Sequence, residues 1–257
     1  GTPRKTGIVY ASELEEPDED EQVEDYAVTL FLSCEGYFKK ITAQSLRMSG
    51  EQKYKDGDGL AVSFESTNRA ELLFLTDKQQ MYKARVSDFE DGKASVLGIY
   101  LPTRLKMDEG ESVIAMIDPG DYKKHLLLMF ENGKAARIEL SAYETKTNRR
   151  KLVGACSGKS PVKAVMLIGE EFDVACYSSD GRALIFNTAQ LQPKTSRSTQ
   201  GVAVMSLKAK RVLERALPLK DSDIQNTARY RVRSIPAAGA LIKGEDRAEK
   251  QLSLMDE

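Results

Sequence analysis

One pattern, repeated four times along the chain, constrains the fold more than any other feature. An apolar run, a short polar turn and a strand-like run with Lys or Arg occur in VTLFLSCEGYFKKI (residues 28–41), ELLFLTDKQQMYKARV (71–86), HLLLMFENGKAARIEL (125–140) and DVACYSSDGRALIFN (173–187). With Gly36, Gln80, Gly133 and Gly181 aligned, the repeats follow one another at steps of 44, 53 and 48 residues. This period is typical of propeller-like arrays of four-stranded blades, or of solenoids.

The turn residues indicate that each repeat is a β-hairpin. Glu-Gly, Asn-Gly and Asp-Gly supply the positive φ angles that tight hairpin turns require. The second repeat has Gln79 and Gln80 instead, so a longer or differently shaped turn is expected there. The flanking runs are rich in Val, Ile, Leu, Phe and Tyr, which favour strands.

Further strand-like segments lie between the hairpins and provide three or four strands for each repeat. They are LAVSFES (60–66), ESVIAMI (111–117), VKAVMLI (162–168) and GVAVMSL (201–207). Helical periodicity is scarce. The best helical candidate is SLKAKRVLERAL (206–217). A strand GVAVMSL (201–207) followed by a turn at 208–210 is an equally good alternative. The sequence therefore predicts an all-β fold.

The near-neutral net charge conceals a basic body with acidic ends. Residues 1–27 contain nine acids against two bases, and residues 245–257 contain five acids against two bases. Residues 28–244 therefore hold 34 bases and 25 acids, a balance of +9. This split is expected of a polyanion binder with acidic appendages, although a surplus of this size also occurs in proteins that bind nothing charged.

Cysteine and histidine usage argues against a disulfide framework and a zinc site. Cys34, Cys156 and Cys176 are odd in number and widely spaced, and His125 is the single histidine. Each cysteine is expected to be a buried, inert thiol, because free cysteine packs as a small hydrophobe. His125 is expected to cap the apolar strand that it begins.

No membrane or secretory segment is predicted. The apolar runs fall well short of the roughly 20 residues that a transmembrane helix needs. The segment GTPRKTGIVY has no apolar region behind its charges, so no secretory signal is expected and a cytoplasmic location is the default.

An independent enzyme is the first rival function. One histidine leaves no catalytic-triad candidate, and ACSGKSP (155–161) lacks the GxxxxGK[ST] spacing of a phosphate-binding loop, so a turn between strands is expected there. The Asp and Glu residues show no paired constellation. We therefore predict neither catalytic residues nor a metal site in this chain.

A propeller-like protein-interaction module is the second rival. Blades of the WD type have a comparable period, but the chain has no tryptophan and so lacks their signature. A rim of positive charge would favour DNA as the ligand, whereas a neutral apolar top face would favour a protein partner.

Several segments resemble the C-terminal domain of the A subunit of the bacterial type IIA topoisomerases, DNA gyrase and topoisomerase IV. Family blades have turns of the form xxGxxKR, which Gly36, Lys39 and Lys40 match well, and which Gly133 with Arg137 and Gly181 with Arg182 match in part. KMDEGESVIAMI (106–117) and LQPKTSRSTQGVAVMSLK (191–208) are similar to family connectors. GTPRKTGIV is similar to the segment that follows the cleavage domain, and the resemblance weakens after Leu217.

The resemblance implies a β-pinwheel of about four to five blades that binds and bends duplex DNA along its outer rim. It implies an acidic linker after the cleavage domain in residues 1–27, the pinwheel in 28–244 and an acidic tail in 245–257. The chain would be the accessory domain of an ATP-dependent DNA topoisomerase, an isomerase, with no active site of its own. No cofactor is expected here, since ATP and Mg are used elsewhere in the holoenzyme.

The partners implied are double-stranded DNA, the remainder of the A subunit, which holds the cleavage core, and the ATPase B subunit. The location implied is the bacterial cytoplasm, at the nucleoid. The A subunits of gyrase carry a basic QRRGGKG box in the first blade. Here the matching region, QSLRMSGEQKYKDGDG (44–59), lacks the clean motif and adds Glu51, Asp56 and Asp58. This departure favours a topoisomerase IV-like domain over a gyrase-like one.

The candidate phosphate contacts are the bases of the repeats and their connectors. They are Lys39, Lys40, Arg47, Lys53, Lys55, Lys83, Arg85, Lys134, Arg137, Arg149, Arg150, Lys151, Arg182, Lys194 and Arg197. The sequence has no base-reading motif, so binding is expected to depend on the DNA backbone and its deformability. The acidic tails, 13–25 and 245–257, are expected to be disordered linkers. In an alternative hypothesis, one of them folds back and competes with DNA for the basic rim.

Overall fold

Four antiparallel hairpins, one for each repeat, form the framework of the fold. A computed structural model describes residues 23–145 and 149–247. The hairpins are β1 (Ala27–Ser33) with β2 (Tyr37–Thr42), β4 (Glu71–Thr76) with β5 (Gln80–Arg85), β8 (His125–Phe130) with β9 (Lys134–Glu139), and β12 (Asp173–Ser178) with β13 (Arg182–Asn187). The predicted all-β class is confirmed.

All four hairpin turns share one conformation. The last turn residue has a positive φ in each case: 92° at Gly36, 54° at Gln79, 81° at Gly133 and 74° at Gly181. The expectation of a longer or different turn in the second repeat is therefore wrong. The residue equivalent to the three glycines is Gln79, not Gln80, because Gln79 adopts the left-handed conformation without being a glycine.

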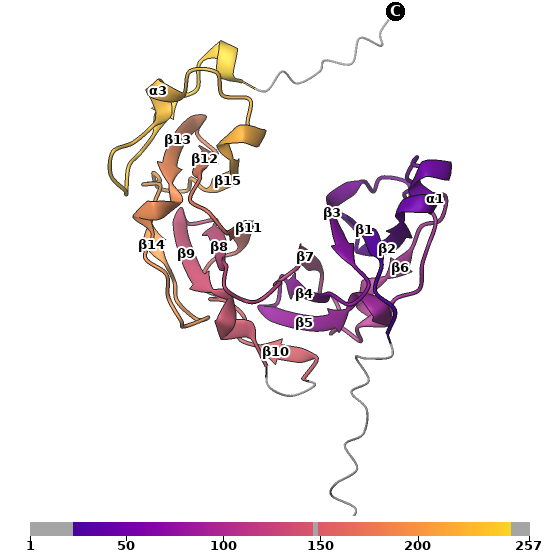
Figure 1. Cartoon of the computed structure of the whole chain (residues 1–257). Helices are drawn as coiled ribbons and strands as arrows, with labels where there is room; N and C mark the ends of the chain where they lie inside the picture. The colour runs from indigo at the N-terminus through magenta and orange to yellow at the C-terminus, as the bar shows by residue number, and fades with distance from the viewer. Residues whose placement is uncertain (1–22, 146–148, 248–257) are drawn as a thin grey trace, which may run out of the picture.

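Each hairpin gains a third strand on the side nearest the centre of the molecule (Figure 1). These inner strands are β3 (Leu60–Thr67), β7 (Val113–Ile117), β11 (Val162–Ile168) and β15 (Leu213–Pro218). All four pair antiparallel with the first strand of their hairpin. The ambiguous segment 206–217 thus contributes a turn and a strand, since Arg211 N bonds to Lys208 O before β15 begins.

A short outer strand completes each four-stranded blade. The outer strands are β6 (Ile99–Tyr100), β10 (Lys151–Val153), β14 (Val202–Ala203) and β16 (Ala240–Leu241). Each of the first three comes from the segment after the hairpin of the following blade, so neighbouring blades exchange strands. The last one lies in RYRVRSIPAAGALI, the segment after Leu217, and pairs with β13.

The residue that precedes an outer strand can lie very close to the backbone of the neighbouring strand, as Gly201 does. Gly201 has φ +74°, and a Cβ built on it would lie 2.1 Å from the carbonyl oxygen of Ala135 on the neighbouring strand. Gly98 and Gly239 precede β6 and β16 with a carbonyl oxygen 2.5 Å from a built Cβ in each case. Only glycine fits such a close approach without displacing the backbone.

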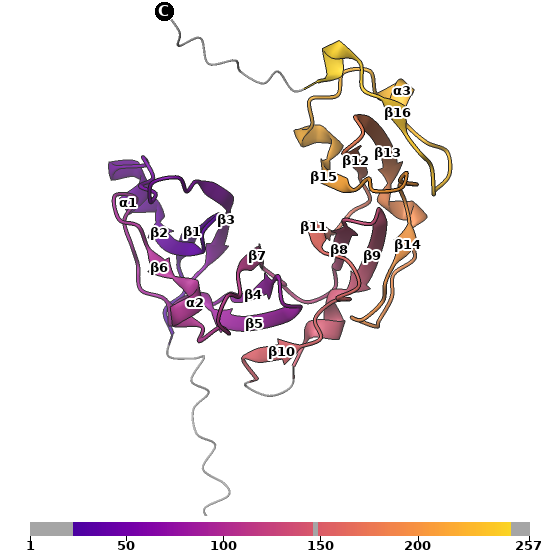
Figure 2. The ribbon, with the colours of Figure 1, turned by 180° about the vertical axis from the view of Figure 1, so that it is seen from behind.

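The blades succeed one another around a ring that is open between blade 1 and blade 4 in both views (Figures 1 and 2). Three apolar cores join consecutive blades. They are centred on Leu30 with Phe74 for blades 1 and 2, Leu75 with Leu128 for blades 2 and 3, and Leu127 with Phe186 for blades 3 and 4. A fourth cluster, around Ile185 and Tyr230, lies within blade 4 and its C-terminal segment. In the described ranges, these core clusters do not join blade 1 to blade 4.

The connections contain short helices that cover the blade edges. These are α1 (Ala43–Met48), α2 (Leu101–Arg104) and α3 (Thr227–Tyr230), with the 3₁₀ turns η3 (Val86–Asp88), η4 (Leu140–Tyr143), η5 (Thr188–Gln190), η6 (Leu219–Asp221) and η7 (Gly244–Asp246). Of the helices that the structure describes, none is long and apolar enough to cross a membrane.

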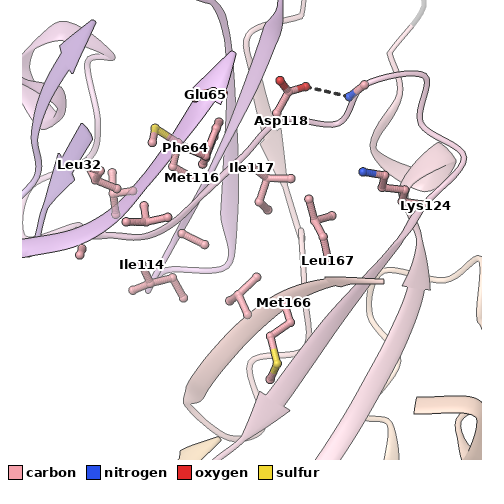
Figure 3. Close-up of a pocket in the computed structure, with 16 residues that line it drawn as sticks. Leu32, Phe64, Glu65, Ile114, Met116, Ile117, Asp118, Lys124, Met166 and Leu167 are labelled. Atoms are coloured by element: carbon pink, nitrogen blue, oxygen red, sulfur yellow. Dashed lines mark hydrogen bonds between the residues drawn. The ribbon is translucent and has the colours of Figure 1, made fainter. Parts of the chain in front are cut away.

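The inner strands of blades 1 to 3 line a central cavity of about 740 Å³ (Figure 3). Its wall is largely apolar and includes Phe64 of β3, Ile114 of β7 and Met166 of β11. Asp118, which accepts a bond from Gly120 N at 3.0 Å, and Lys124 lie at one side. The concave side of the ring is therefore chemically distinct from its outer edge.

Candidate nucleic-acid interface

Lys39, predicted as a phosphate contact, is buried in blade 1 with 4% of its surface exposed. Its ammonium donates to Gln52 Oε1 at 3.1 Å and to the carbonyl oxygens of Lys53 and Ala94 at 2.9 and 3.0 Å. Burial lowers the pKa of Lys39. Its three donors are thus engaged in joining two connecting segments to β2, and the predicted DNA contact is replaced by a structural role.

Lys40, the next residue of β2, is also withdrawn from solvent, with 3% exposure. It donates to Asn68 Oδ1 at 2.9 Å and forms an ion pair with Asp91 at 3.1 Å. A buried cation needs such partners, because an unpaired charge in the interior is very costly. The prediction that Lys40 contacts phosphate is therefore wrong, as it is for Lys39.

Arg137 of β9 is the third candidate that the fold buries. Its guanidinium donates to Glu171, to the Thr188 carbonyl and, through Nε at 2.8 Å, to Nδ1 of His125. Burial and the neighbouring Arg137 charge lower the pKa of His125. His125 does begin β8, as predicted, but it also accepts this bond. Arg137 thus acts as a structural link between blades 3 and 4 and is not available to a phosphate.

Six further candidates are half-buried, and most have partners within the protein. They are Lys83, Arg85, Lys134, Lys151, Arg182 and Arg197. Lys83 pairs with Glu71 at 3.2 Å and Lys151 with Asp108 at 3.1 Å, while Arg197 donates to the Ala142 carbonyl at 2.7 Å. Ion pairs of this kind at a surface contribute little, so such cations can exchange a carboxylate for a phosphate.

The remaining six candidates are exposed on the edges of blades 1 to 3. They are Arg47, Lys53, Lys55, Arg149, Arg150 and Lys194. Lys55 pairs with Glu35 at 3.2 Å, and Arg150 approaches Asp88 at 3.6 Å. Within the described part of the chain, Arg47, Lys53, Arg149, Lys194 and the half-buried Lys134 form no ion pair with an acidic side chain. These five cations are spread over three blades.

The most basic surface of the molecule lies beyond the predicted candidates, which end at Arg197. Residues 198–247 hold ten bases against five acids, and all ten are exposed. They are Lys208, Lys210, Arg211, Arg215, Lys220, Arg229, Arg231, Arg233, Lys243 and Arg247. The surplus of bases in residues 198–247 is visible in the sequence, but the repeat pattern that selects candidates does not extend to them.

The ends of the body differ from the predicted tails. Asp246, assigned by sequence to the acidic tail, is buried and accepts bonds from Gln225 N and Tyr230 Oη. It thereby fixes the C-terminal segment against blade 4. Residues 1–22 and 248–257, which hold most of both predicted tails, lie outside the described residues.

The cysteines and acids show where reactive or metal-binding groups lie. Cys156 and Cys176 are buried, as predicted, but Cys34 is exposed in the first hairpin turn, so the prediction is wrong for that residue. A turn places its side chain away from the core. Across residues 23–145 and 149–247, no three His, Cys, Asp or Glu side chains gather as a metal site would require.

Parts of this chain are similar to known proteins. A family model described as the DNA gyrase C-terminal domain, a β-propeller, matches residues 70–118 and 173–211. The first segment spans β4 to β7 and the second spans β12 to β14. These two segments are similar to the DNA gyrase C-terminal domain. The resemblance to the A subunit of the type IIA topoisomerases is therefore confirmed.

Similar proteins agree with this assignment. The A subunit of DNA gyrase from Borreliella burgdorferi is 22% identical over 231 residues, which cover 86% of this chain and 28% of the relative. The chain thus spans less than a third of that curated relative. The C-terminal domain of DNA topoisomerase IV has a TM-score of 0.67 at 22% identity, covering 78% of this chain and 64% of the other. The E. coli ParC C-terminal domain has a TM-score of 0.63 at 16% identity, covering 85% and 94%. These two structures confirm the fold.

The region that matches the gyrase box has an unusual place in the fold. In blades 2 to 4, the segment between the second hairpin strand and the inner strand supplies the outer strand of the preceding blade. In blade 1 the same segment, residues 43–59, forms α1 and a loop held by Lys39. It adds no described strand to a blade, and it presents Arg47 and Lys53 to solvent at the open end of the ring (Figure 1).

Proposed function

We propose that the chain binds duplex DNA along the outer rim of its four blades and bends it. The observation that carries this proposal is the distribution of exposed cations. Arg47, Lys53, Lys134, Arg149 and Lys194 lie on blades 1 to 3, and the ten exposed bases of residues 198–247 surround blade 4. A polyanion that follows these cations around the ring must curve.

Physical considerations favour the DNA backbone as the ligand. Lys and Arg contacts release the counterions condensed on DNA, so affinity should fall steeply with salt. Bending a short site by 40–90° costs on the order of 1–6 kcal/mol, which many contacts around the rim would offset. Sequence preference should therefore reflect deformability more than base recognition.

In the complete enzyme, the chain would present a DNA segment to a cleavage core supplied by the rest of the A subunit, in concert with the ATPase B subunit. ATP and Mg would be used in those parts. This role places the protein in the bacterial cytoplasm at the nucleoid. The similarity to the gyrase relative and to topoisomerase IV domains supports such an assembly.

We retain a topoisomerase IV-like role as the preferred form of this proposal, because the gyrase box is degenerate. The curated relative reported above is a gyrase protein, and the similar solved structures include both a topoisomerase IV domain and a DNA gyrase A domain, so the choice requires an activity measurement. The chain is incubated with relaxed circular DNA and ligase, and the superhelicity retained after protein removal is read on a gel. Retained writhe would favour a gyrase-like role, and bending without retained writhe a topoisomerase IV-like role.

The binding itself is tested by titrating linear duplex across a salt series. We expect the logarithm of affinity to fall linearly with the logarithm of salt, with a slope of about −0.9 for each phosphate contacted. A variant with Arg47, Lys53, Lys134 and Lys194 changed to Ala should have a shallower slope. Absence of binding at low salt would contradict the proposal. It would favour the alternative, a protein-interaction module, for which the apolar central cavity is the specific supporting feature.

A further inference from the structure

The outer strands carry exposed apolar side chains that the fold does not explain. In the described ranges, eight large hydrophobic residues are exposed, and four of them lie on the outer strands. Those strands contain only two, three, two and two residues. The exposed fractions are 45% for Tyr100, 67% for Val153, 47% for Val202 and 55% for Leu241. Every blade therefore places one large apolar side chain at its outer edge.

Three of these four side chains recur at one structural position. Tyr100 pairs with Tyr37, Val153 with Gln80 and Leu241 with Arg182, each partner being the first residue of the second hairpin strand. In blade 3 that position is Ala203, which is also exposed, and the large side chain is its neighbour Val202. Equivalent positions in successive blades lie along one line around the rim.

A cation accompanies the apolar side chain in blades 1 and 2. In blade 1, the Tyr37 and Tyr100 rings are 5.1 Å apart, and the exposed Lys55 pairs at 3.2 Å with Glu35 of the turn that precedes Tyr37. In blade 2, Lys151 lies two residues before Val153, so both side chains emerge on the same side of β10.

The same combination occurs in blades 3 and 4. Lys134 is the cross-strand partner of Ala203, next to Val202. Arg182 is the partner of Leu241, and the Arg229 guanidinium donates to the Leu241 carbonyl at 3.2 Å. An apolar tip beside a cation is thus a repeated feature of the rim.

We propose that Tyr100, Val153, Val202 and Leu241 are minor-groove contacts that bend the DNA held by the neighbouring cations. This inference rests on the proposed DNA binding and deepens it. Proteins that bend DNA from the minor groove combine basic side chains with apolar wedges that partly unstack base steps. A protein partner fits the same surface poorly, because the apolar tips are separated by cations and the outer strands are too short to extend a sheet across an interface.

The chain offers a matched control for the test. The outer-rim variant combines Tyr100→Ser, Val153→Ser, Val202→Ser and Leu241→Ser. The control variant changes the other four exposed hydrophobic residues, as Met48→Ser, Leu60→Ser, Val96→Ser and Ile114→Ser. All eight substitutions lie at exposed positions, and the single change Val153→Ser, at the most exposed of the four outer positions, provides a further variant with minimal effect on folding.

Bending is measured by energy transfer between the ends of a labelled duplex at saturating protein. Two duplexes are compared, one with central TA steps that kink easily and one with a stiff A-tract. We expect the outer-rim variant to bend DNA less, to lose the preference for TA steps and to bind roughly tenfold more weakly. Its salt slope should stay unchanged, because the phosphate contacts remain, and the control should behave as the unmodified chain.

Each alternative result has a distinct meaning. If the outer-rim variant and the control variant bend DNA equally and prefer TA steps equally, the inference is overturned. The proposed function would still stand in that case, provided that the unmodified chain binds DNA. An unmodified chain that forms oligomers, with a monomeric outer-rim variant, would also overturn it by assigning the outer strands to contacts between copies. An unmodified chain that binds neither duplex would refute the proposed function itself.

Discussion

Arg137 and Glu171 form a two-point ion pair, with Nη2 to Oε1 at 2.8 Å and Nη1 to Oε2 at 3.1 Å. The pair joins β9 of blade 3 to the segment that leads into blade 4. The same guanidinium bonds to His125 and to the Thr188 carbonyl, so one side chain connects three parts of the fold. A residue expected to meet DNA instead sets how two blades meet.

Replacing Arg137 should therefore affect folding. Arg137→Met leaves His125, the Thr188 carbonyl and Glu171 without their shared donor. Because Glu171 is partly exposed, we expect a loss of about 2 kcal/mol in the free energy of unfolding. Arg150→Met is the control, since its exposed pair with Asp88 at 3.6 Å should contribute under about 0.5 kcal/mol. Urea denaturation checks both values, and equal stability of the two variants would contradict the structural role of Arg137.

The single histidine should make stability depend on pH. Burial, together with the Arg137 charge, lowers the folded-state pKa of His125 from its ordinary value of 6.5, and the carboxylates Glu139 and Glu171 oppose this shift. The unfolded chain then binds the proton more readily, so the contribution of His125 is present above about pH 6.5 and is lost as pH falls below it. Melting temperatures between pH 8 and 5.5 should decline more in the unmodified chain than in His125→Gln. Parallel curves would contradict the shift.

Replacing Lys39 or Lys53, which contact each other in blade 1, should distinguish an effect on folding from an effect on DNA binding. Lys39→Met leaves buried acceptors unpaired, and we expect it to cost about 3 kcal/mol of stability without changing the salt slope of DNA binding. Lys53→Met should leave the melting temperature unchanged and reduce the salt slope by about 1. A lower salt slope for a folded Lys39 variant would show that Lys39 does reach phosphate.

Two glycines with positive φ should differ in their tolerance of alanine. Gly57 has φ +82° with nothing within 4 Å of a built Cβ, so Gly57→Ala should cost about 1–2 kcal/mol from the backbone conformation alone. Gly201→Ala adds the 2.1 Å contact with the Ala135 carbonyl and should cost more than about 3 kcal/mol. Thermal unfolding of the two variants compares them directly, and equal costs would mean that β14 can shift away from β9.

The cysteines should differ in reactivity towards a thiol reagent. Burial raises the pKa of Cys156 to about 11 and raises that of Cys176 further, which disfavours their thiolates. Cys34 is exposed, so the folded chain should react with one equivalent and the unfolded chain with three. Mass spectrometry after labelling identifies the site. Rapid modification of Cys176 in the folded chain would contradict the closed core between blades 3 and 4.

The hairpins and the first three inner strands were predictable because the information is local. An apolar run followed by a turn of fixed chemistry and a second strand-like run specifies a hairpin within about sixteen residues. The one error of alignment fell at Gln79, where a non-glycine residue adopts φ 54° and the sequence gives no sign of it. The outer strands were harder, since they consist of two or three residues and the first three of them find their partners in the preceding blade.

The burial of Lys39, Lys40 and Arg137 could not be read from the pattern. In sequence, a Lys or Arg on a strand indicates a solvated side chain, because these residues are rarely fully buried unless paired. Their partners come from distant segments: Lys39 meets Ala94, which lies 55 residues away, and Arg137 meets Glu171, 34 residues away. Only the three-dimensional structure reveals which charged side chains are buried and which are exposed on the rim.

Strand exchange also determines how such a chain can be lengthened or shortened during evolution. The compact unit seen in space is a blade, but its four strands come from two stretches of chain, and a cut between hairpins leaves one blade without its edge. A duplication that preserves every sheet must run from one hairpin through the next inner strand, taking with it the edge of the blade before. The stretch of chain that can be duplicated as a unit is therefore shifted along the sequence relative to the four strands that form one blade.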